Sequence, residues 1–212
     1  MALVVFSDVH GNLPALELML EHAGHADGYV CLGDVVGYGP WSNECVDLVT
    51  ALPNLVYLEG NHEADFVRGR YAGRNPVAQQ FFDVCHPRFT RFEEISTLDT
   101  SHHRNGFTFA HTIDGRYIFP DTPIGLDGNY VLGHTHRQFS VRRPPFWLHN
   151  PGSVGQNRRY IDVVDYMTLE AETMTFSPRS FTYDVDLVVN EMRSRDYPAS
   201  CVGYYAGKPR RG

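Results

Sequence analysis

The chain has 212 residues, of which 42% are hydrophobic and 20% charged, and a formal net charge of -7. This length and composition predict one ordinary globular domain spanning residues 1–212, and the negative charge argues against general affinity for nucleic-acid backbones or anionic membranes. The four scattered cysteines, the absence of a basic leader and the absence of any apolar run approaching about 18 residues predict a reduced, cytoplasmic protein without a membrane span.

The N-terminal part of the chain alternates between short apolar runs and amphipathic segments. Three apolar runs predict buried strands: Ala2–Phe6, Gly28–Leu32 and Leu55–Leu58. Residues 12–24 predict a helix that Gly24 ends, and residues 41–52 predict a second helix capped by Ser42 or Asn43. Repeated β-α steps favour a sheet with crossover helices, which is an α/β fold.

The remaining chain is less regular at first and then rich in short strands. Residues 64–105 contain one clear helical stretch, and we expect them to form an insertion that supplies much of the substrate-pocket wall. Four short strands are predicted next: Phe107–Ala110, Tyr130–Leu132, Phe139–Val141 and Phe146–His149. Residues 160–166 and 169–176 predict a hairpin or a meander, Asp184 could cap a last helix, and we expect residues 206–212 to be loose.

Polar side chains follow almost every predicted strand. They are Asp8 and His10, Asp34, Asn61 and His62, His111, and His134 and His136. In open α/β sheets the loops after the strands converge at one edge, where ligands bind. The pair His134 and His136 alone could be no more than a polar patch, but the whole series predicts a binding site at this edge.

The residue types indicate which ligand this edge would bind. Two divalent cations about 3.5–4 Å apart need a bridging carboxylate to screen their repulsion, and Asp34 suits that role. Mixed imidazole and carboxylate ligands favour manganese, iron, zinc, cobalt or nickel over calcium or magnesium. Glu63 and Asp65 could also bind metal, but carboxylates in the first turn of a helix interact favourably with its dipole, and we prefer that interpretation.

Five short motifs resemble those of the small prokaryotic calcineurin-like metallophosphoesterases, in their phosphodiesterase-like branch. The motifs are SDVHGNL, GDVVGYGP, GNHE, GHTH and NPGSVG, and the resemblance covers residues 3–63 and 106–156. It implies a four-layer α/β/β/α sandwich with a dinuclear metal site where the strands end. It also implies two divalent transition-metal ions, with manganese expected first.

The resemblance implies a ligand set for each ion. One ion would be bound by Asp8, His10, Asp34 and His136, and the other by Asp34, Asn61, His111 and His134. The family usually has glycine where Thr112 follows His111, so His102 and His103 are kept as alternatives to His111.

The same resemblance implies hydrolysis of a phosphodiester or phosphomonoester. A hydroxide bridging both ions would attack phosphorus, and His62 would donate a proton to the leaving group. The substrate could be a nucleotide, another small molecule or a phosphoprotein. The alternative function is a non-catalytic, protein-binding scaffold on the same fold, and a complete set of ligands with His62 argues against it.

Substrate contacts are less specific. Asn12 could touch a phosphate or cap the helix that follows it. Tyr38 and Trp41 could stack on an aromatic group or cover a hinge. Arg158, with its neighbour Arg159, could clamp a phosphate or be solvated.

Overall fold

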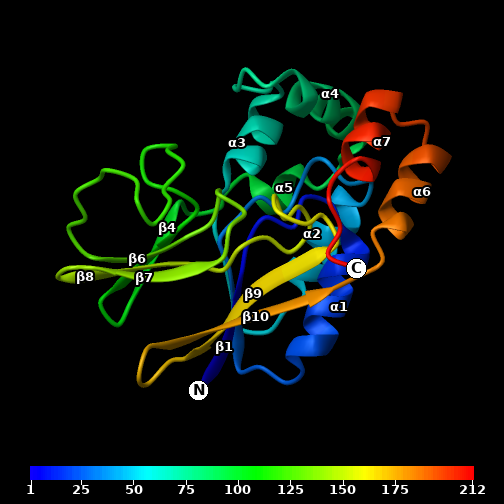
Figure 1. Ribbon diagram of the computed structural model, residues 1–212. Helices are drawn as coiled ribbons and strands as arrows, with labels where there is room; N and C mark the ends of the chain where they lie inside the picture. Colours follow the sequence, from blue (N-terminus) through cyan, green and yellow to red (C-terminus); the bar gives the residue numbers. More distant parts are fainter.

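The computed structural model describes residues 1–212 as ten strands, seven α-helices and one short 3-10 helix. The strands form two five-stranded sheets, with the order β10-β9-β1-β2-β3 in the first and β4-β5-β6-β8-β7 in the second. Helices cover one face of the first sheet, and the second sheet packs against its other face (Figure 1). The mixed α/β fold with two packed sheets is therefore confirmed.

The first sheet combines a parallel and an antiparallel half. Its strands are β1 (Ala2–Phe6), β2 (Gly28–Cys31), β3 (Leu55–Tyr57), β9 (Val163–Glu170) and β10 (Thr175–Thr182). Strands β1, β2 and β3 run parallel, and β9 joins β1 antiparallel and pairs with β10 as a hairpin. The carboxyl ends of the three parallel strands therefore meet at one edge.

The second sheet also combines parallel and antiparallel strands. Its strands are β4 (Ser101–Arg104), β5 (Phe107–Ala110), β6 (Asn129–Leu132), β7 (Phe139–Arg143) and β8 (Phe146–Asn150). Strands β5, β6 and β8 are parallel, and the edge strands β4 and β7 are antiparallel to their neighbours.

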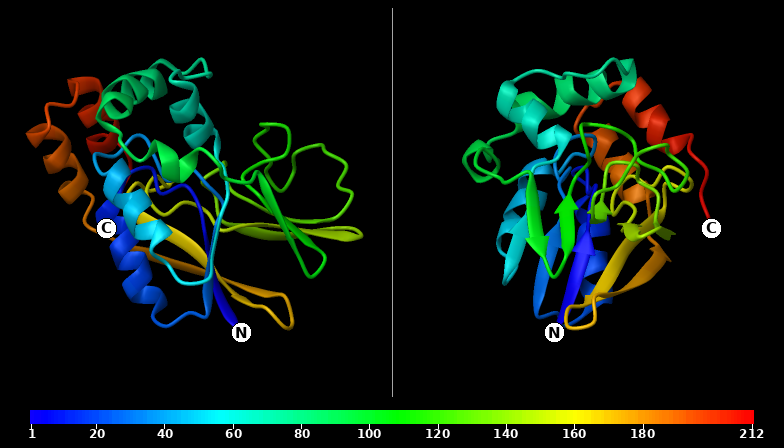
Figure 2. Two further views of the ribbon diagram at one scale, coloured as in Figure 1. Left: turned by 180° about the vertical axis from the view of Figure 1, so that it is seen from behind. Right: turned by 90° about the vertical axis from the view of Figure 1, so that its left-hand side faces the viewer.

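The helices lie mostly on the outer face of the first sheet and above its edge. They are α1 (Leu13–Ala23), α2 (Ser42–Thr50), α3 (Asn61–Arg68), α4 (Pro76–Cys85), η1 (His86–Arg88), α5 (Phe92–Ile95), α6 (Asp186–Ser194) and α7 (Ala199–Ala206). Figure 2 shows α1, α2, α6 and α7 on one side of the first sheet and α3 and α4 above the loops. No helix is both long and apolar enough to cross a bilayer.

Strand β1 is buried on both faces, which explains its unbroken apolar sequence. Val4 and Phe6 belong to the large core between the first sheet and the helices. Leu3 and Val5, pointing the opposite way, belong to the core between the two sheets. A strand with both faces covered has no solvent-facing positions, so it shows no polar alternation.

The outer face of the second sheet has a different cover. Ala110, Leu132 and Leu148 on this face pack with Ile118, which lies in the connection between β5 and β6. Residues 111–128 contain no helix, so an irregular segment forms the outermost layer here (Figure 2).

Several predicted boundaries need correction. Helix α2 has Trp41 at its N-cap with no side-chain hydrogen bond, while the Ser42 hydroxyl accepts from the backbone of Gly37 and the Asn43 side chain bonds to residues 88 and 90. The predicted hairpin exists, but its turn falls at residues 171–174 instead of 167–168. Met167 and Leu169 face the core between the sheets, so β9 continues through the predicted turn.

The C-terminal tail is not loose, contrary to expectation. Helix α7 precedes it and buries Cys201 and Tyr205. The carbonyl of Pro209 accepts a hydrogen bond from Ile161, and the Asp162 carboxylate accepts from the backbone nitrogen of Arg211 at 2.8 Å. These contacts join the last residues to a distant part of the chain, which no local sequence pattern reveals.

Candidate active site

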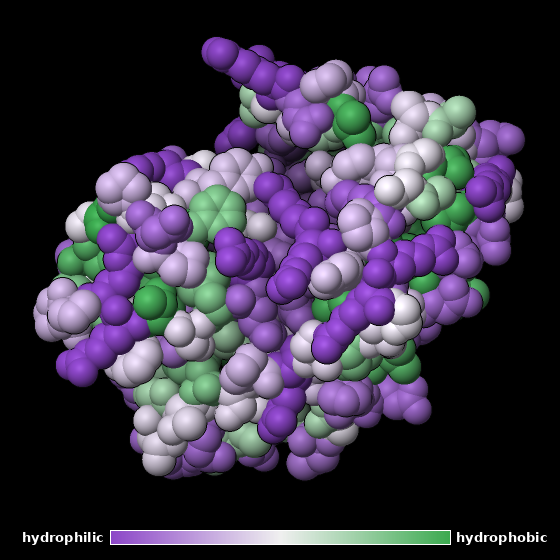
Figure 3. Space-filling model, viewed as in Figure 1, coloured by the Kyte–Doolittle hydropathy of each residue, from purple (hydrophilic) through white to green (hydrophobic).

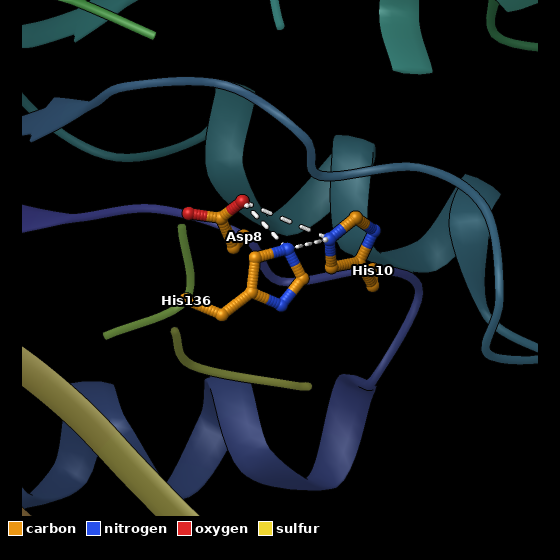
Figure 4. Close-up of side chains that lie close together, drawn as sticks. All are labelled: Asp8, His10 and His136. Atoms are coloured by element: carbon orange, nitrogen blue, oxygen red, sulfur yellow. Dashed lines mark hydrogen bonds and ion pairs between the residues drawn. The ribbon is translucent and has the colours of Figure 1, made fainter. Parts of the chain in front are cut away.

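The side chains predicted as metal ligands lie together where the parallel strands of both sheets end. The first group contains Asp8, His10 and His136, whose side chains point toward one another (Figure 4). His136 Nε2 lies 3.2 Å from both Asp8 Oδ1 and His10 Nε2. His10 Nε2 lies 3.9 Å from Asp34 Oδ2, which connects this group to the next one.

The second group is built around the same oxygen of Asp34. His111 Nε2 lies 3.1 Å from Asp34 Oδ2 and 3.2 Å from both Asn61 Oδ1 and His134 Nδ1. His102 and His103, the alternatives to His111, lie on β4 outside the clusters that could bind a metal. The structure thus gathers the seven residues around the Asp34 carboxylate, and His62 forms a further group with His10 and Asp34 that could also hold a metal.

Backbone contacts orient two of the imidazoles. His111 Nδ1 bonds to the carbonyl of Leu32 at 3.0 Å, and His136 Nδ1 bonds to the carbonyl of Gln156 at 2.7 Å. A carbonyl can only accept, so each Nδ1 donates its proton to the backbone and each Nε2 is left to face the cluster. A hydrogen bond from the ring nitrogen that faces away from the ion is the usual way in which proteins orient histidines that bind metals.

The two aspartates are oriented in the same way. His134 donates its backbone N–H to Asp8 Oδ2 at 3.1 Å, and His62 donates its backbone N–H to Asp34 Oδ1 at 2.8 Å. In each carboxylate one oxygen is held and the other faces the cluster. Asp8 Oδ1 is buried and has no hydrogen-bond partner, an arrangement that is costly unless a cation satisfies the oxygen.

The backbone of the site is held in a sparsely populated conformation. Five of the seven residues have a positive φ between 50° and 67°: Asp8, His10, Asp34, His134 and His136. Residues other than glycine rarely adopt this region, and such conformations cluster at functional sites. Surrounding contacts hold these loops in place, for example the hydrogen bonds from Gly155 N and Ser153 Oγ to the carbonyl of Asp8.

The Glu63 carboxylate accepts hydrogen bonds from the backbone of two loops that carry site residues. It is the third residue of α3, where its carboxylate accepts from the Gly60 backbone nitrogen at 3.0 Å, and it also accepts from the backbone nitrogens of Asp34 and Val35, both at 2.7 Å. Glu63 is absent from the clusters that could bind a metal. Its role extends beyond the helix dipole, because it joins the loop after β2 to the start of α3.

Burial and the attraction between opposite charges shift the pKa values of the clustered side chains. Burial opposes ionisation of Asp34, but His111 and His62 outweigh it and hold the pKa of Asp34 well below its ordinary value. Burial would likewise lower the pKa of His111, yet the attraction of Asp34 raises it to about 9. Burial lowers the pKa of His10 to about 3 and that of His134 to about 4, so both stay neutral, as metal ligands must be.

The donor set therefore fits divalent cations. Imidazole nitrogens, carboxylate oxygens and one amide oxygen converge in a largely buried environment. This mixture suits transition metals, and a carboxylate shared between two groups of donors suits a pair of them.

A cavity of about 320 Å³ opens directly onto these groups, and Tyr71, Asn75 and Ala78, from the segment expected to form the pocket, line part of it. Tyr38, His62 and Arg158 line it, so three residues singled out in the sequence face the substrate side. On the face drawn in Figure 3, hydrophilic side chains gather along the furrow between the helices and the second sheet.

Two other sequence interpretations are decided by packing. Asn12 is fully buried and accepts from the backbone of Ala15, while its amide donates to Gly155 and Tyr183. It caps α1 and has no free group for a phosphate. Trp41 lies outside the cavity and packs against the helical core.

The sequence reasoning missed four residues that line the cavity: Tyr117, Gln156, Tyr204 and Lys208. Gln156 directly follows the NPGSVG motif and could have been found from that position. The other three come from a long connection and from the C-terminal region. No motif marks them.

Comparisons with known proteins agree with the geometry. The family model for calcineurin-like phosphoesterases matches residues 1–190. Phosphodiesterase YfcE of Escherichia coli K12 is 30% identical over 73% of this chain and 79% of its own length. The uncharacterized protein MJ0912 of Methanocaldococcus jannaschii is 26% identical over 86% of this chain and 88% of its own.

A solved structure is similar over nearly the whole length. The metallophosphoesterase from Sphaerobacter thermophilus superimposes with a TM-score of 0.81 at 27% identity, covering 97% of this chain and 98% of that one. The match of the family model over most of the chain and the likeness to a phosphodiesterase support metal-dependent hydrolysis of phosphoesters. The chain belongs to the calcineurin-like phosphoesterase family.

Proposed function

We propose that the protein hydrolyses phosphodiesters with the help of two divalent metal ions, manganese first among the candidates. The single observation that carries the proposal is the Asp34 carboxylate, whose Oδ2 faces His10 on one side and His111 on the other. The likeness to a phosphodiesterase supports the diester, and the complete donor set argues against a protein-binding scaffold.

The seven residues would share the two ions between them. Asp8, His10, Asp34 and His136 would hold one ion, and Asp34, Asn61, His111 and His134 the other. When bound, such ions supply an activated water as nucleophile and neutralise charge on the phosphoryl oxygens. The chain contributes the rigid placement of the donors, since backbone contacts hold both carboxylates and two of the imidazoles.

His62 is the proposed proton donor to the leaving oxygen. Its side chain lines the cavity, and its ring lies 4.7 Å from that of His10 and 5.3 Å from that of Tyr38. Burial lowers the pKa of His62, which makes its imidazolium a stronger acid but a minor form at neutral pH, and a bound phosphate beside the ring would favour the protonated form. Its backbone is fixed to Asp34, which keeps the ring beside the cluster.

The test uses metal-stripped protein reloaded with Mn²⁺. Bis-p-nitrophenyl phosphate is assayed beside p-nitrophenyl phosphate, with Asp34→Asn as the control, and bound manganese is counted by elemental analysis. We expect about two ions per chain and manganese-dependent turnover of the diester. Both should be lost in Asp34→Asn, because an amide cannot bridge two cations.

Each other outcome has a clear meaning. Turnover of the monoester alone would contradict the diester specificity and indicate a phosphatase. Silence on both substrates with two bound ions would overturn hydrolysis of simple aryl diesters. Failure to bind manganese at all would overturn the proposal and favour the scaffold.

A further inference from the structure

Two cationic side chains face the cavity without any acidic partner. Arg158 and Lys208 both line it, and neither forms an ion pair with a carboxylate. The Arg158 guanidinium carbon lies 5.0 Å from the centre of the Tyr117 ring, and Lys208 Nζ lies 4.1 Å from the centre of the Tyr204 ring. In a protein of net charge -7, two cations without a carboxylate partner in one cavity are unusual.

Lys208 is held in this place and is not a mobile surface lysine. Its Nζ is buried and has no hydrogen-bond partner. The hydrogen bonds from Ile161 to Pro209 and from Arg211 to Asp162 anchor the chain on its C-terminal side. A buried ammonium without a partner is costly, and proteins keep one where a ligand completes it.

The two cations also repel each other. Burial, and after it the charge of Arg158, lowers the pKa of Lys208 to about 8. Aromatic rings stabilise each cation but do not neutralise it. An anion between them would remove the repulsion and the cost of burying the Lys208 ammonium, while Arg158 is exposed to solvent.

The cavity has room for an anionic group in addition to a phosphate at the metal cluster. Asp34, Asn61, His134 and His136 open onto the same cavity, so the cations and the candidate metal ligands share one space. Its volume of about 320 Å³ is in the range of sites for whole small molecules and far exceeds one phosphate group. The cavity can therefore hold a second charged group beside the one being hydrolysed.

We propose that Lys208 and Arg158 bind a second phosphate group of the substrate. The substrate class is then a phosphodiester that carries a further phosphate group beside the one being hydrolysed, and adenosine diphosphate serves as a binding probe with two phosphates. This inference rests on the proposed function and adds the substrate class to it. Arg158 supplies a planar fork for two phosphate oxygens, and Lys208 supplies a point charge.

The experiment measures binding of adenosine monophosphate and adenosine diphosphate to the manganese-loaded full chain by calorimetry. The ratio of the two dissociation constants reports the contribution of the second phosphate. We expect the diphosphate to bind at least about tenfold more tightly to the natural protein. Lys208→Met and, independently, Arg158→Met should each reduce this ratio severalfold, and Lys208→Arg should restore most of it.

Arg159→Met is the matched control. Arg159 is the neighbour of Arg158, lies 5.2 Å from the ring of Tyr160, and lines an adjacent hollow instead of the cavity. The ratio should stay unchanged in this variant. If Arg159→Met lowers the ratio as much as Lys208→Met does, the second phosphate lies in the hollow and the inference is wrong.

The remaining outcomes separate this inference from the proposed function. Equal weakening of both nucleotides in Lys208→Met would mean that the lysine contacts the hydrolysed phosphate, which overturns the second-phosphate site. Turnover of bis-p-nitrophenyl phosphate with equal affinity for both nucleotides would overturn the site alone. Absence of turnover and of metal binding would instead overturn the proposed function. Thermal melting of each variant tests whether misfolding causes the change in the ratio. If Lys208→Met does not fold, Arg158→Met still tests the inference.

Discussion

His62 and Asp34 are joined by the backbone of one and the side chain of the other. The N–H of His62 donates to Asp34 Oδ1 at 2.8 Å, while Asp34 Oδ2 faces His111 at 3.1 Å. The same carboxylate therefore positions the proposed proton donor and would bridge the two ions. Because the contact uses the main chain of His62, its imidazole can be removed without breaking it.

The first prediction concerns His62→Ala. Manganese binding should persist, since the backbone contact to Asp34 remains. Turnover of diesters with alkyl-alcohol leaving groups should fall about 10²–10⁴-fold, the usual contribution of a general acid. Turnover of p-nitrophenyl esters should fall much less, because that leaving group needs little protonation. Equal losses in kcat for the two classes of ester would exclude the proton-donor role.

Glu63→Gln tests whether the hydrogen bonds of the Glu63 carboxylate stabilise the site. Glu63 Oε1 accepts from Val35, Val36 and the Tyr57 hydroxyl, and Oε2 accepts from Asp34 and Gly60. An amide NH₂ at either position would face hydrogen-bond donors and leave them unsatisfied. We expect the free energy of unfolding to fall by about 2–4 kcal/mol, with weaker manganese binding.

Urea denaturation and a manganese titration measure these two effects. Glu21→Gln, at an exposed position on α1 without side-chain hydrogen bonds, is the control and should change stability by under about 0.5 kcal/mol. Unchanged stability in Glu63→Gln would show that the hydrogen bonds of this carboxylate contribute little.

Gly33→Ala tests the close approach of two loops. Gly33 has a φ of 103°, and a methyl group there would lie 2.4 Å from the backbone nitrogen of Gly60. Backbone cannot yield as a flexible side chain can, so we expect a loss of at least about 3 kcal/mol in the free energy of unfolding. Gly115→Ala shares the positive φ but meets no atom within 4 Å, and it should cost only about 1 kcal/mol. Similar thermal melting of the two variants would contradict the steric argument.

His149 predicts a pH dependence of stability. Burial lowers its pKa from 6.5 to about 4, and its ring stacks on Phe176 with 4.2 Å between ring centres. The folded state therefore binds fewer protons than the unfolded state between these two values. This group's contribution to stability is intact above about pH 6.5 and is lost progressively as the pH falls toward 4, by up to roughly 3 kcal/mol.

His149→Phe should remove this part of the acid sensitivity. The Ser140 hydroxyl, which bonds to His149 Nδ1 at 2.8 Å, is in an exposed residue and can bond to water instead. Chemical denaturation at about pH 7 and about pH 5 should show a smaller loss of stability in the variant than in the natural protein. The exposed His25→Phe is the control and should keep the natural pH dependence. The same loss in His149→Phe and the natural protein would show that His149 does not titrate as proposed.

The amino-acid sequence alone predicted the strands that position the site and the side chains that gather there. Ala2–Phe6 is apolar without interruption, and Phe107–Ala110 contains one polar residue, Thr108, because both faces of each strand are largely covered; the bounds of both agree with the structure. Asp8, His111 and His134 follow such runs within two residues, so their place at the strand ends depended only on local order. That these side chains bind metal stays a prediction for the manganese titration.

Only the tertiary structure decided the features that depend on contacts between distant segments. The turn between β9 and β10 moved because Met167 and Leu169 fill the core between the sheets. Lys208 lies at the cavity because hydrogen bonds to Asp162 and from Ile161 fix the C-terminal residues near the site. A local pattern records the period of a strand or helix, and it contains no information on which remote backbone group satisfies a hydrogen bond. The candidate metal ligands could therefore be predicted from the local sequence, whereas the positions of Arg158 and Lys208 in the cavity wall depend on the tertiary structure.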